Sequence, residues 1–181
     1  IVVIVEEPTN IVTALELEDG STRYRVALPF KGQDVFTPIR IGDQLVLTST
    51  TRAAVIDANN GALRRAFDLP ALIETSPRLS DGLLVATSPT GLVFGIDPDS
   101  GLTVWRYQMP AAIATSPAIA ENLIVVGDVN GNYSAFFAGR GEVAWRGRTF
   151  GRITASPAGS GSAVFIPSED HSLYALARAN G

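Results

Sequence analysis

Short apolar stretches separated by turn residues recur along the whole chain. Within residues 75–114, for example, the apolar run Leu83–Thr87 lies between Asp81-Gly82 and Ser88–Gly91. Strands of about five residues, broken by turns every 8–12 residues, are typical of all-β folds. No stretch keeps a helical period of 3.6 residues over three turns. The pattern therefore predicts strands and almost no helix.

The strand pattern itself repeats about every 40 residues. A Ser-Pro or Thr-Pro pair returns with this spacing, and so does a glycine followed four residues later by Tyr, Arg or Trp. The recurring positions are Pro38, Pro77, Pro117 and Pro157, then Gly20, Gly61, Gly101 and Gly141, then Tyr24, Arg65, Trp105 and Trp145. A fixed period in this range predicts a repeat architecture.

Each complete repeat contains four predicted strands. In the third copy these are Pro77–Ser80, Leu83–Thr87, Leu92–Asp97 and Leu102–Gln108. One four-stranded antiparallel sheet per 40-residue repeat is typical of a β-propeller blade, which needs neighbouring blades to bury its faces. The sequence therefore predicts an all-β propeller.

We expect residues 1–181 to form a single propeller domain with three full blades and two partial blades. The full blades are expected at residues 35–74, 75–114 and 115–154, and the partial blades at residues 1–34 and 155–181. Both terminal copies contain a second and a third strand, so they cannot merge into one standard blade. Two alternatives remain: part of a larger propeller, which we favour, or a five-bladed ring with two shortened blades.

Composition narrows the function mainly by exclusion. The chain is 46% hydrophobic and carries a net charge of −4, with no basic stripe that could neutralise the phosphates of a nucleic acid. It contains no cysteine, which excludes disulfides and thiolate chemistry. No apolar run reaches the roughly 18 residues that a transmembrane helix needs. The lone His171 and the hairpin Asp128–Asn132 fit exposed polar turns better than a metal site.

The segment Gly95–Trp105, with the sequence GIDPDSGLTVW, resembles the repeat of the pyrroloquinoline-quinone-like (PQQ-like) propeller family. That repeat carries an aspartate, a glycine and a tryptophan with the spacing of Asp97, Gly101 and Trp105. In physical terms, the glycine permits a tight turn, the aspartate caps it, and the tryptophan can pack between adjacent blades. We expect structural roles for these three positions.

The other copies keep only parts of this pattern. The second copy has Asp57 at the aspartate position but Arg65 in place of tryptophan, and the fourth has Trp145 but Phe137 in place of aspartate. The first copy has Tyr24 at the tryptophan position. The resemblance covers essentially the whole chain and implies the propeller fold, but a fold alone does not determine function.

The resemblance implies two classes of function. The quinoprotein dehydrogenases of the family hold a quinone and a calcium ion beside an adjacent cysteine pair, which this chain lacks. The BamB-like branch is non-catalytic and offers its blade loops to a protein partner. The resemblance therefore implies a scaffold for protein–protein interaction in the bacterial cell envelope, with no cofactor and no catalytic residues. Two alternatives stay open: part of a PQQ-dependent dehydrogenase, or an extracellular sensor or ligand-binding domain.

The hairpin tips between the second and third strands are the candidate partner-binding rim. Loops on a rigid scaffold commonly carry function, and short polar tips suit a protein partner better than an enclosed ligand. Besides the tip at Glu6–Asn10, the candidate residues are Arg52, Thr90, Asn130, Asn132 and His171.

The expected partners are proteins, either in a membrane-associated complex or as a second propeller chain. Neither nucleic acid nor a transmembrane segment is expected. The first residue is Ile1 rather than methionine, which indicates a processed or trimmed chain. Together with the resemblance, this implies an extracytoplasmic location, periplasmic or at the cell surface, with a lipid anchor open for the full-length protein.

Overall fold

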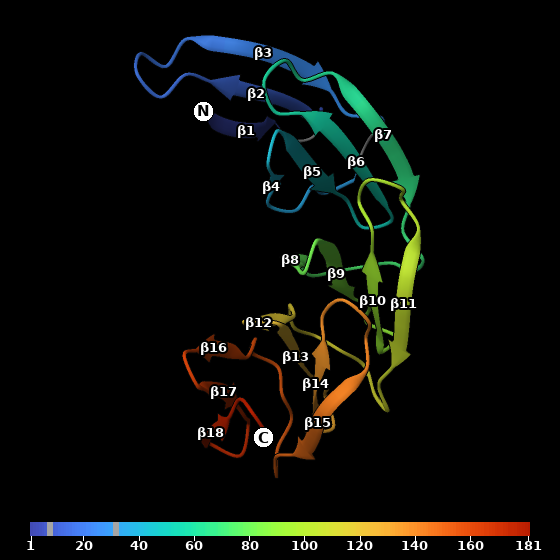
Figure 1. The fold of residues 1–181 in the computed structure, drawn as a ribbon, viewed down its shortest axis with the longest axis vertical. Helices are drawn as coiled ribbons and strands as arrows, with labels where there is room; N and C mark the ends of the chain where they lie inside the picture. The colour runs from blue at the N-terminus through green and yellow to red at the C-terminus, as the bar shows by residue number, and fades with distance from the viewer. Residues whose placement is uncertain (7–8, 31–32) are drawn as a thin grey trace. The chain divides into compact units, whose positions relative to one another are not determined.

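The computed structural model describes residues 1–6, 9–30 and 33–181, and these residues form strands, turns and loops without a helix. Their strands make five antiparallel sheets, three with four strands and two with three (Figure 1). The predicted all-β architecture of three full and two partial blades is confirmed. Within the described ranges, no helix could span a membrane.

The chain divides into two compact units, residues 1–70 and residues 71–181. That the whole chain forms a single domain stays a prediction. Unit 1 contains two sheets, and each sheet follows chain order. Its strands are β1 (Val2–Glu6), β2 (Ile11–Leu15) and β3 (Thr22–Ala27), then β4 (Ile39–Ile41), β5 (Gln44–Thr48), β6 (Arg52–Asp57) and β7 (Leu63–Asp68).

Unit 2 contains the other three sheets. Its strands are β8 (Arg78–Ser80), β9 (Leu83–Thr87), β10 (Leu92–Ile96) and β11 (Thr103–Gln108), then β12 (Ala118–Ala120), β13 (Leu123–Gly127), β14 (Asn132–Phe137) and β15 (Val143–Arg148), then β16 (Ala158–Ser160), β17 (Ala163–Pro167) and β18 (Leu173–Ala177). In the third copy, every strand end lies within one residue of its predicted position. Turn residues bound these strands closely, which explains the agreement.

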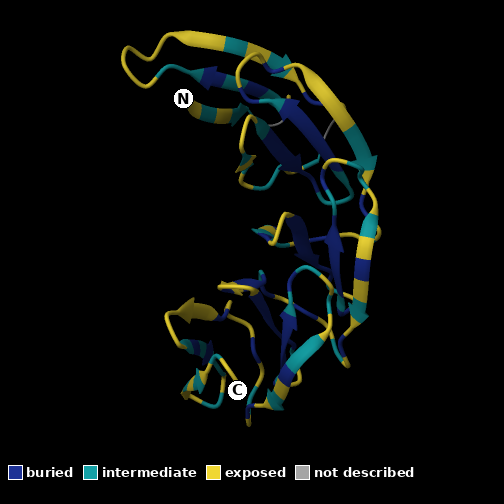
Figure 2. Cartoon of the chain, in the orientation of Figure 1, coloured by how far each residue is buried: buried dark blue, intermediate teal, exposed yellow. Residues whose placement is uncertain are grey.

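Consecutive sheets within a unit pack face to face through apolar side chains. In unit 2, Val85 and Val93 of one sheet belong to the same apolar cluster as Ile124, Val126 and Phe136 of the next. Alternate residues of a strand point to opposite faces, so the second and third strands bury apolar residues on both sides. Figure 2 shows this burial in β9, β10, β13 and β14, whereas much of the fourth strand is exposed.

A register shift recurs where each third strand meets its fourth strand. In β10 the shift lies between Gly95 and Ile96, and it leaves Val104 of β11 without a partner in the ladder. Equivalent shifts occur in the first, second and fourth sheets. A bulge of this kind re-aims the neighbouring side chain. In β11 that neighbour is Trp105, which is buried while Val104 is half-exposed.

Candidate interaction surface

Trp105 joins two consecutive sheets of unit 2. Its Nε1 donates a hydrogen bond of 2.8 Å to the carbonyl of Ala138, and its ring stacks on Phe136 with centroids 6.3 Å apart. The indole also covers Gly141, the turn glycine of the next sheet, whose φ is +68°. A Cβ at Gly141 would overlap the ring. Gly141 is therefore required both by its backbone conformation and by the tryptophan above it.

Two further turn glycines are covered in the same way. Trp145 lies over Gly181 and donates from Nε1 to the carbonyl of Arg178 at 2.7 Å. In unit 1, the ring of Tyr24 lies over Gly61. By contrast, no described atom lies within 4 Å of where a Cβ of Gly20 would be, although its φ is +71°.

The recurring aspartates cap their own turns. Asp57 accepts a backbone hydrogen bond of 2.8 Å from Asn59, and Asp97 accepts one of 3.0 Å from Asp99. A hydrogen bond from Arg64 is the main reason that the pKa of Asp57 lies below its usual range. Where Phe137 replaces the aspartate, the backbone still closes the turn. These hydrogen bonds are those of an aspartate that caps a turn.

The recurring prolines stand one residue before the first strand of their sheets. Proline cannot donate to a ladder and is tolerated at the start of a strand. The four prolines Pro38, Pro77, Pro117 and Pro157 precede β4, β8, β12 and β16, respectively.

In unit 2 the hairpin tips and the linkers between sheets form one hydrogen-bonded rim. The amide of Met109 donates to Gly91 at 2.9 Å, and the amide of Val129 donates to Ala112 at 2.9 Å. In the same way, the amide of Thr149 donates to the carbonyl of Gly131, and the amide of Glu169 donates to the carbonyl of Arg152, both at 2.9 Å. The tip at 128–132 is thus fastened to the linkers on both sides, the tip at 88–91 to the linker that follows it, and the tip at 168–171 to the linker that precedes it. We call this set of tips and linkers, residues 88–91, 109–113, 128–132, 149–154 and 168–171, the unit 2 rim.

Four of the five candidate residues lie on or beside this rim. The hydroxyl groups of Thr90 and Ser88 are hydrogen-bonded at 3.0 Å, and Asn132 donates from Nδ2 to Asp128 at 2.8 Å. Asn130 and His171 are exposed, and His171 has a positive φ of +68°. The rim therefore offers Asn130 and His171 to solvent, while the side chain of Asn132 is used within its own hairpin.

Arg52, the fifth candidate, lies in unit 1. It donates from Nε to Asp68 at 2.9 Å and from Nη1 to the carbonyl of Pro29 at 2.9 Å. The bond to Pro29 fastens its hairpin to the preceding linker, and Asp68 lies opposite Arg52 in the same sheet. The predicted tip at Glu6–Asn10 includes residues 7–8, which lie outside the described residues.

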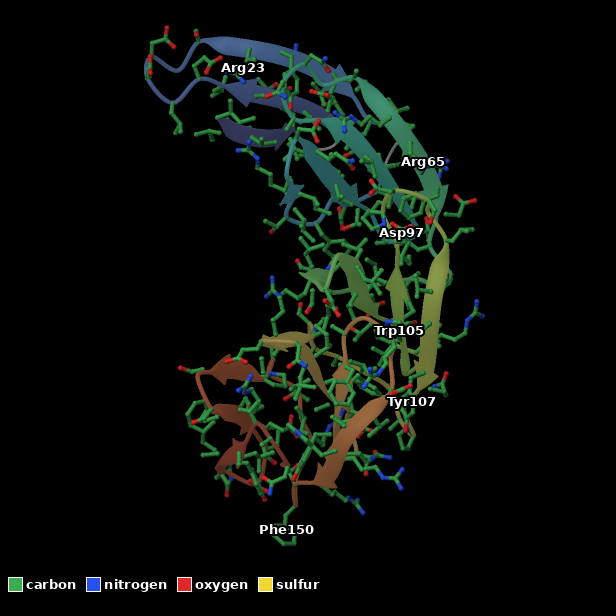
Figure 3. All side chains as sticks on the ribbon, viewed as in Figure 1. Arg23, Arg65, Asp97, Trp105, Tyr107 and Phe150 are labelled. Carbon is green, nitrogen blue, oxygen red and sulfur yellow. The ribbon has the colours of Figure 1, made fainter. Side chains whose placement is uncertain are left out.

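The sequence reasoning missed Phe150. This residue lies on the linker between β15 and β16, and 98% of its surface is exposed. Figure 3 shows its side chain pointing away from the sheets of its unit. A signal was available, because the equivalent linker positions carry Pro70 and Pro110. Phe150 is an aromatic residue at a position where these two repeats have proline, and this difference could have drawn attention to it.

The described residues do not fit a quinone–calcium site. Across residues 1–6, 9–30 and 33–181, no three His, Cys, Asp or Glu side chains are grouped so that they could hold a metal ion. The chain also lacks the cysteines of the quinoprotein dehydrogenases. The one strongly shifted carboxyl group on the rim is Asp170, whose pKa is lowered to about 2, chiefly by the hydrogen bond from Tyr174. This is an acceptor for neighbouring donors rather than a proton-transfer group.

The family model described as "Outer membrane protein assembly factor BamB" matches residues 8–118 and again residues 89–181. This chain belongs to the BamB family. The PQQ-like propeller resemblance seen in the sequence is thereby confirmed. No curated protein sequence matches the chain significantly.

Solved structures agree with this BamB-family fold at low sequence identity. BamB from Moraxella catarrhalis is 19% identical with a TM-score of 0.75, over 94% of this chain and 53% of that chain. The designed Ika4 protein is 15% identical with a TM-score of 0.72, over 87% of this chain and 98% of that one. The quinohemoprotein alcohol dehydrogenase ADHIIG from Pseudomonas putida HK5 is 17% identical with a TM-score of 0.64, over 80% of this chain and 32% of that chain. The chain thus spans about half the length of the BamB structure.

Proposed function

We propose that this chain is a non-catalytic propeller scaffold that binds a protein partner through its hairpin-tip rim. Membership of the BamB family supports this class of function. The observation that carries the proposal is the unit 2 rim, where backbone hydrogen bonds of 2.9 Å fasten successive tips and linkers in place. A surface that is already ordered loses little conformational entropy when a partner binds.

The proposed setting is the bacterial cell envelope. The matched family description names an outer membrane protein assembly factor, so we propose an extracytoplasmic, periplasmic location and a partner in a membrane-associated assembly. Lipid anchorage of the full-length protein is part of the same proposal.

A quinoprotein function is the second candidate, because ADHIIG shares the fold. An identity of 17% supports the fold alone, and the donor groups of the described residues do not fit a calcium-bound quinone. The scaffold is therefore favoured. A sensor or ligand-binding role would also use exposed loops, but the short tips of the rim suit a protein surface better.

Site-specific photocrosslinking tests the scaffold directly. We would place the photoreactive residue p-benzoylphenylalanine at Asn130, on the rim, and separately at Arg140, an exposed residue of the turn between β14 and β15. In cells of the source bacterium, the rim position is expected to give a discrete adduct with an envelope protein, and the turn position is not. Equal labelling from both positions, or none from Asn130, contradicts the proposal.

A further inference from the structure

Phe150 is an aromatic side chain that its own fold leaves almost entirely in water. It lies between two buried linker residues, Thr149 at 2% exposure and Ile153 at 0%, yet its own exposure is 98%. Its side chain points away from the sheets of unit 2 (Figure 3). A free phenylalanine ring exposes a large apolar area, and such side chains are the usual anchors of protein interfaces. The ring therefore contributes nothing to the core of its unit.

The backbone beneath this ring is firmly held. Thr149 donates its amide to Gly131 at 2.9 Å and its hydroxyl to the carbonyl of Gly151 at 2.7 Å. The amide of Phe150 donates to Asp170 Oδ2 at 3.0 Å. Gly151 packs so closely on the backbone of Asp170 that a Cβ could not be accommodated. Because the loop is fixed in advance, burying the ring in a partner would cost little ordering entropy.

The equivalent linkers show that the fold does not need an aromatic residue here. Pro70 and Pro110 occupy the corresponding positions, and both are exposed. Proline lacks the amide hydrogen that Phe150 donates to Asp170. The Phe150 linker is therefore a local departure from the repeat with its own supporting contact, which a purely structural linker would not require.

An unpaired positive charge stands two residues before Phe150 in the sequence. Arg148 makes no ion pair among the described residues and only donates to the carbonyl of Asn130, in the neighbouring hairpin tip, at 3.3 Å. The nearby acids are already occupied: Glu169 faces Arg152 at 3.7 Å, and Asp170 accepts from Tyr174 at 2.7 Å. Aromatic side chains and arginine are both enriched at protein interfaces.

We propose that Phe150 inserts into an apolar pocket of a protein partner, and that a carboxylate bordering this pocket pairs with Arg148. The inference rests on the proposed scaffold function and names the chemistry of its partner. A protein is favoured over an anionic lipid surface, because recognition of anionic lipids relies on clusters of several Lys and Arg side chains, whereas this chain has a net charge of −4 and no basic stripe.

The test begins with p-benzoylphenylalanine at position 150 itself, in cells of the source bacterium. Mass spectrometry of the adduct is expected to place the crosslink within an apolar stretch of one protein, next to Asp or Glu residues. The purified partner is then titrated against Phe150→Ala, Arg148→Glu and a control, Leu102→Ala, which removes a 68% exposed side chain that is outside the rim and far from Phe150 along the sequence.

The expected loss of affinity is ~30-fold for Phe150→Ala and ~5-fold for Arg148→Glu, with no change for Leu102→Ala, as for a buried anchor and a flanking charge. The melting temperature of Phe150→Ala should equal that of the wild type, because the ring is not part of the core. Crosslinks to lipid or to a second copy of the chain would overturn the inference, and so would wild-type affinity in Phe150→Ala. If Asn130 still captures a partner in that case, the scaffold stands without the Phe150 anchor; if neither position captures one, both proposals fail.

Discussion

The sheets β12–β15 and β16–β18 of unit 2 have similar strands but very different surroundings. In β14, four central residues are buried, whereas the equivalent strand β18 alternates between exposed and intermediate positions. The middle sheet is packed on both faces, by β8–β11 and by β16–β18. In the described residues, β16–β18 packs through one face only. The local sequence determines strands and turns, but burial depends on the neighbouring sheet.

The turn glycines also show that burial depends on the neighbouring sheet. Gly141 and Gly20 have nearly equal φ angles of +68° and +71°. An indole covers Gly141, while no described atom approaches the Cβ position of Gly20. Each repeat thus forms this turn from its own residues, whereas an aromatic ring covers the turn glycine only where a neighbouring repeat supplies that ring.

The largest expected effect is the removal of the aromatic cover. Trp105→Ala should destabilise the protein by ~3–5 kcal/mol, because it empties a core site and leaves the Ala138 carbonyl without its donor. Val104→Ala, one residue away on the exposed side of the same strand, should cost under ~0.5 kcal/mol. Urea unfolding followed by circular dichroism measures both. Similar costs for the two variants would show that the tryptophan is not a packing residue.

Alanine at the two glycines separates backbone strain from packing. Gly20→Ala should cost about 1–2 kcal/mol, the usual penalty for a left-handed alanine. Gly141→Ala should cost a further ~1–3 kcal/mol, because its methyl group would collide with Trp105. The same unfolding experiment gives the difference. If the two costs are equal, Gly141 is not constrained by the indole.

A matched pair of apolar truncations compares a covered face with an open one. Val93 in β10 is fully buried and Leu173, its equivalent in β18, is 65% exposed. Val93→Ala should cost ~2 kcal/mol, and Leu173→Ala less than ~0.5 kcal/mol despite the larger deletion. A high cost at Leu173 would mean that β18 is covered in solution, by another strand or by a second copy of the chain.

The smallest effect concerns acid stability at the rim. The pKa of Asp170 is about 2 in the folded protein, below its ordinary value of 3.8, chiefly because Tyr174 donates to it. A carboxyl group whose pKa is lower in the folded state stabilises the folded protein at pH values above its unfolded pKa. This stabilisation is lost as the pH falls towards the folded pKa. Asp170→Asn should therefore show a weaker fall in melting temperature between pH 4 and pH 2 than the wild type. An identical pH profile would contradict this.

Much of the fold could be predicted from the sequence, because its signals are local. The Asp81-Gly82 turn and the Pro98–Gly101 turn bound strands whose ends lie within a residue of those predicted. The repeat spacing then indicated the number of sheets. By contrast, no local sequence signal predicted the division of the chain into two units.

The interaction surface was only partly visible in the sequence. The tips could be located as hairpins, but which side chains stay free depends on contacts between segments. Asn132 turned out to bind Asp128 within its hairpin, and Arg52 binds Asp68 and the preceding linker. Phe150 was missed because a single apolar residue between two strands carries no sign of whether it is buried, and only the folded structure shows its ring in water.

The central claim is that this chain works as a scaffold and not as a cofactor-binding enzyme. The most direct measurement is a titration of the purified chain with pyrroloquinoline quinone and Ca²⁺, followed by quinone absorbance and by the melting temperature. The account predicts no saturable spectral change and no thermal shift. Saturable binding with stabilisation of ~2.7 kcal/mol at a hundredfold excess over Kd, the size that mass action requires, would contradict it.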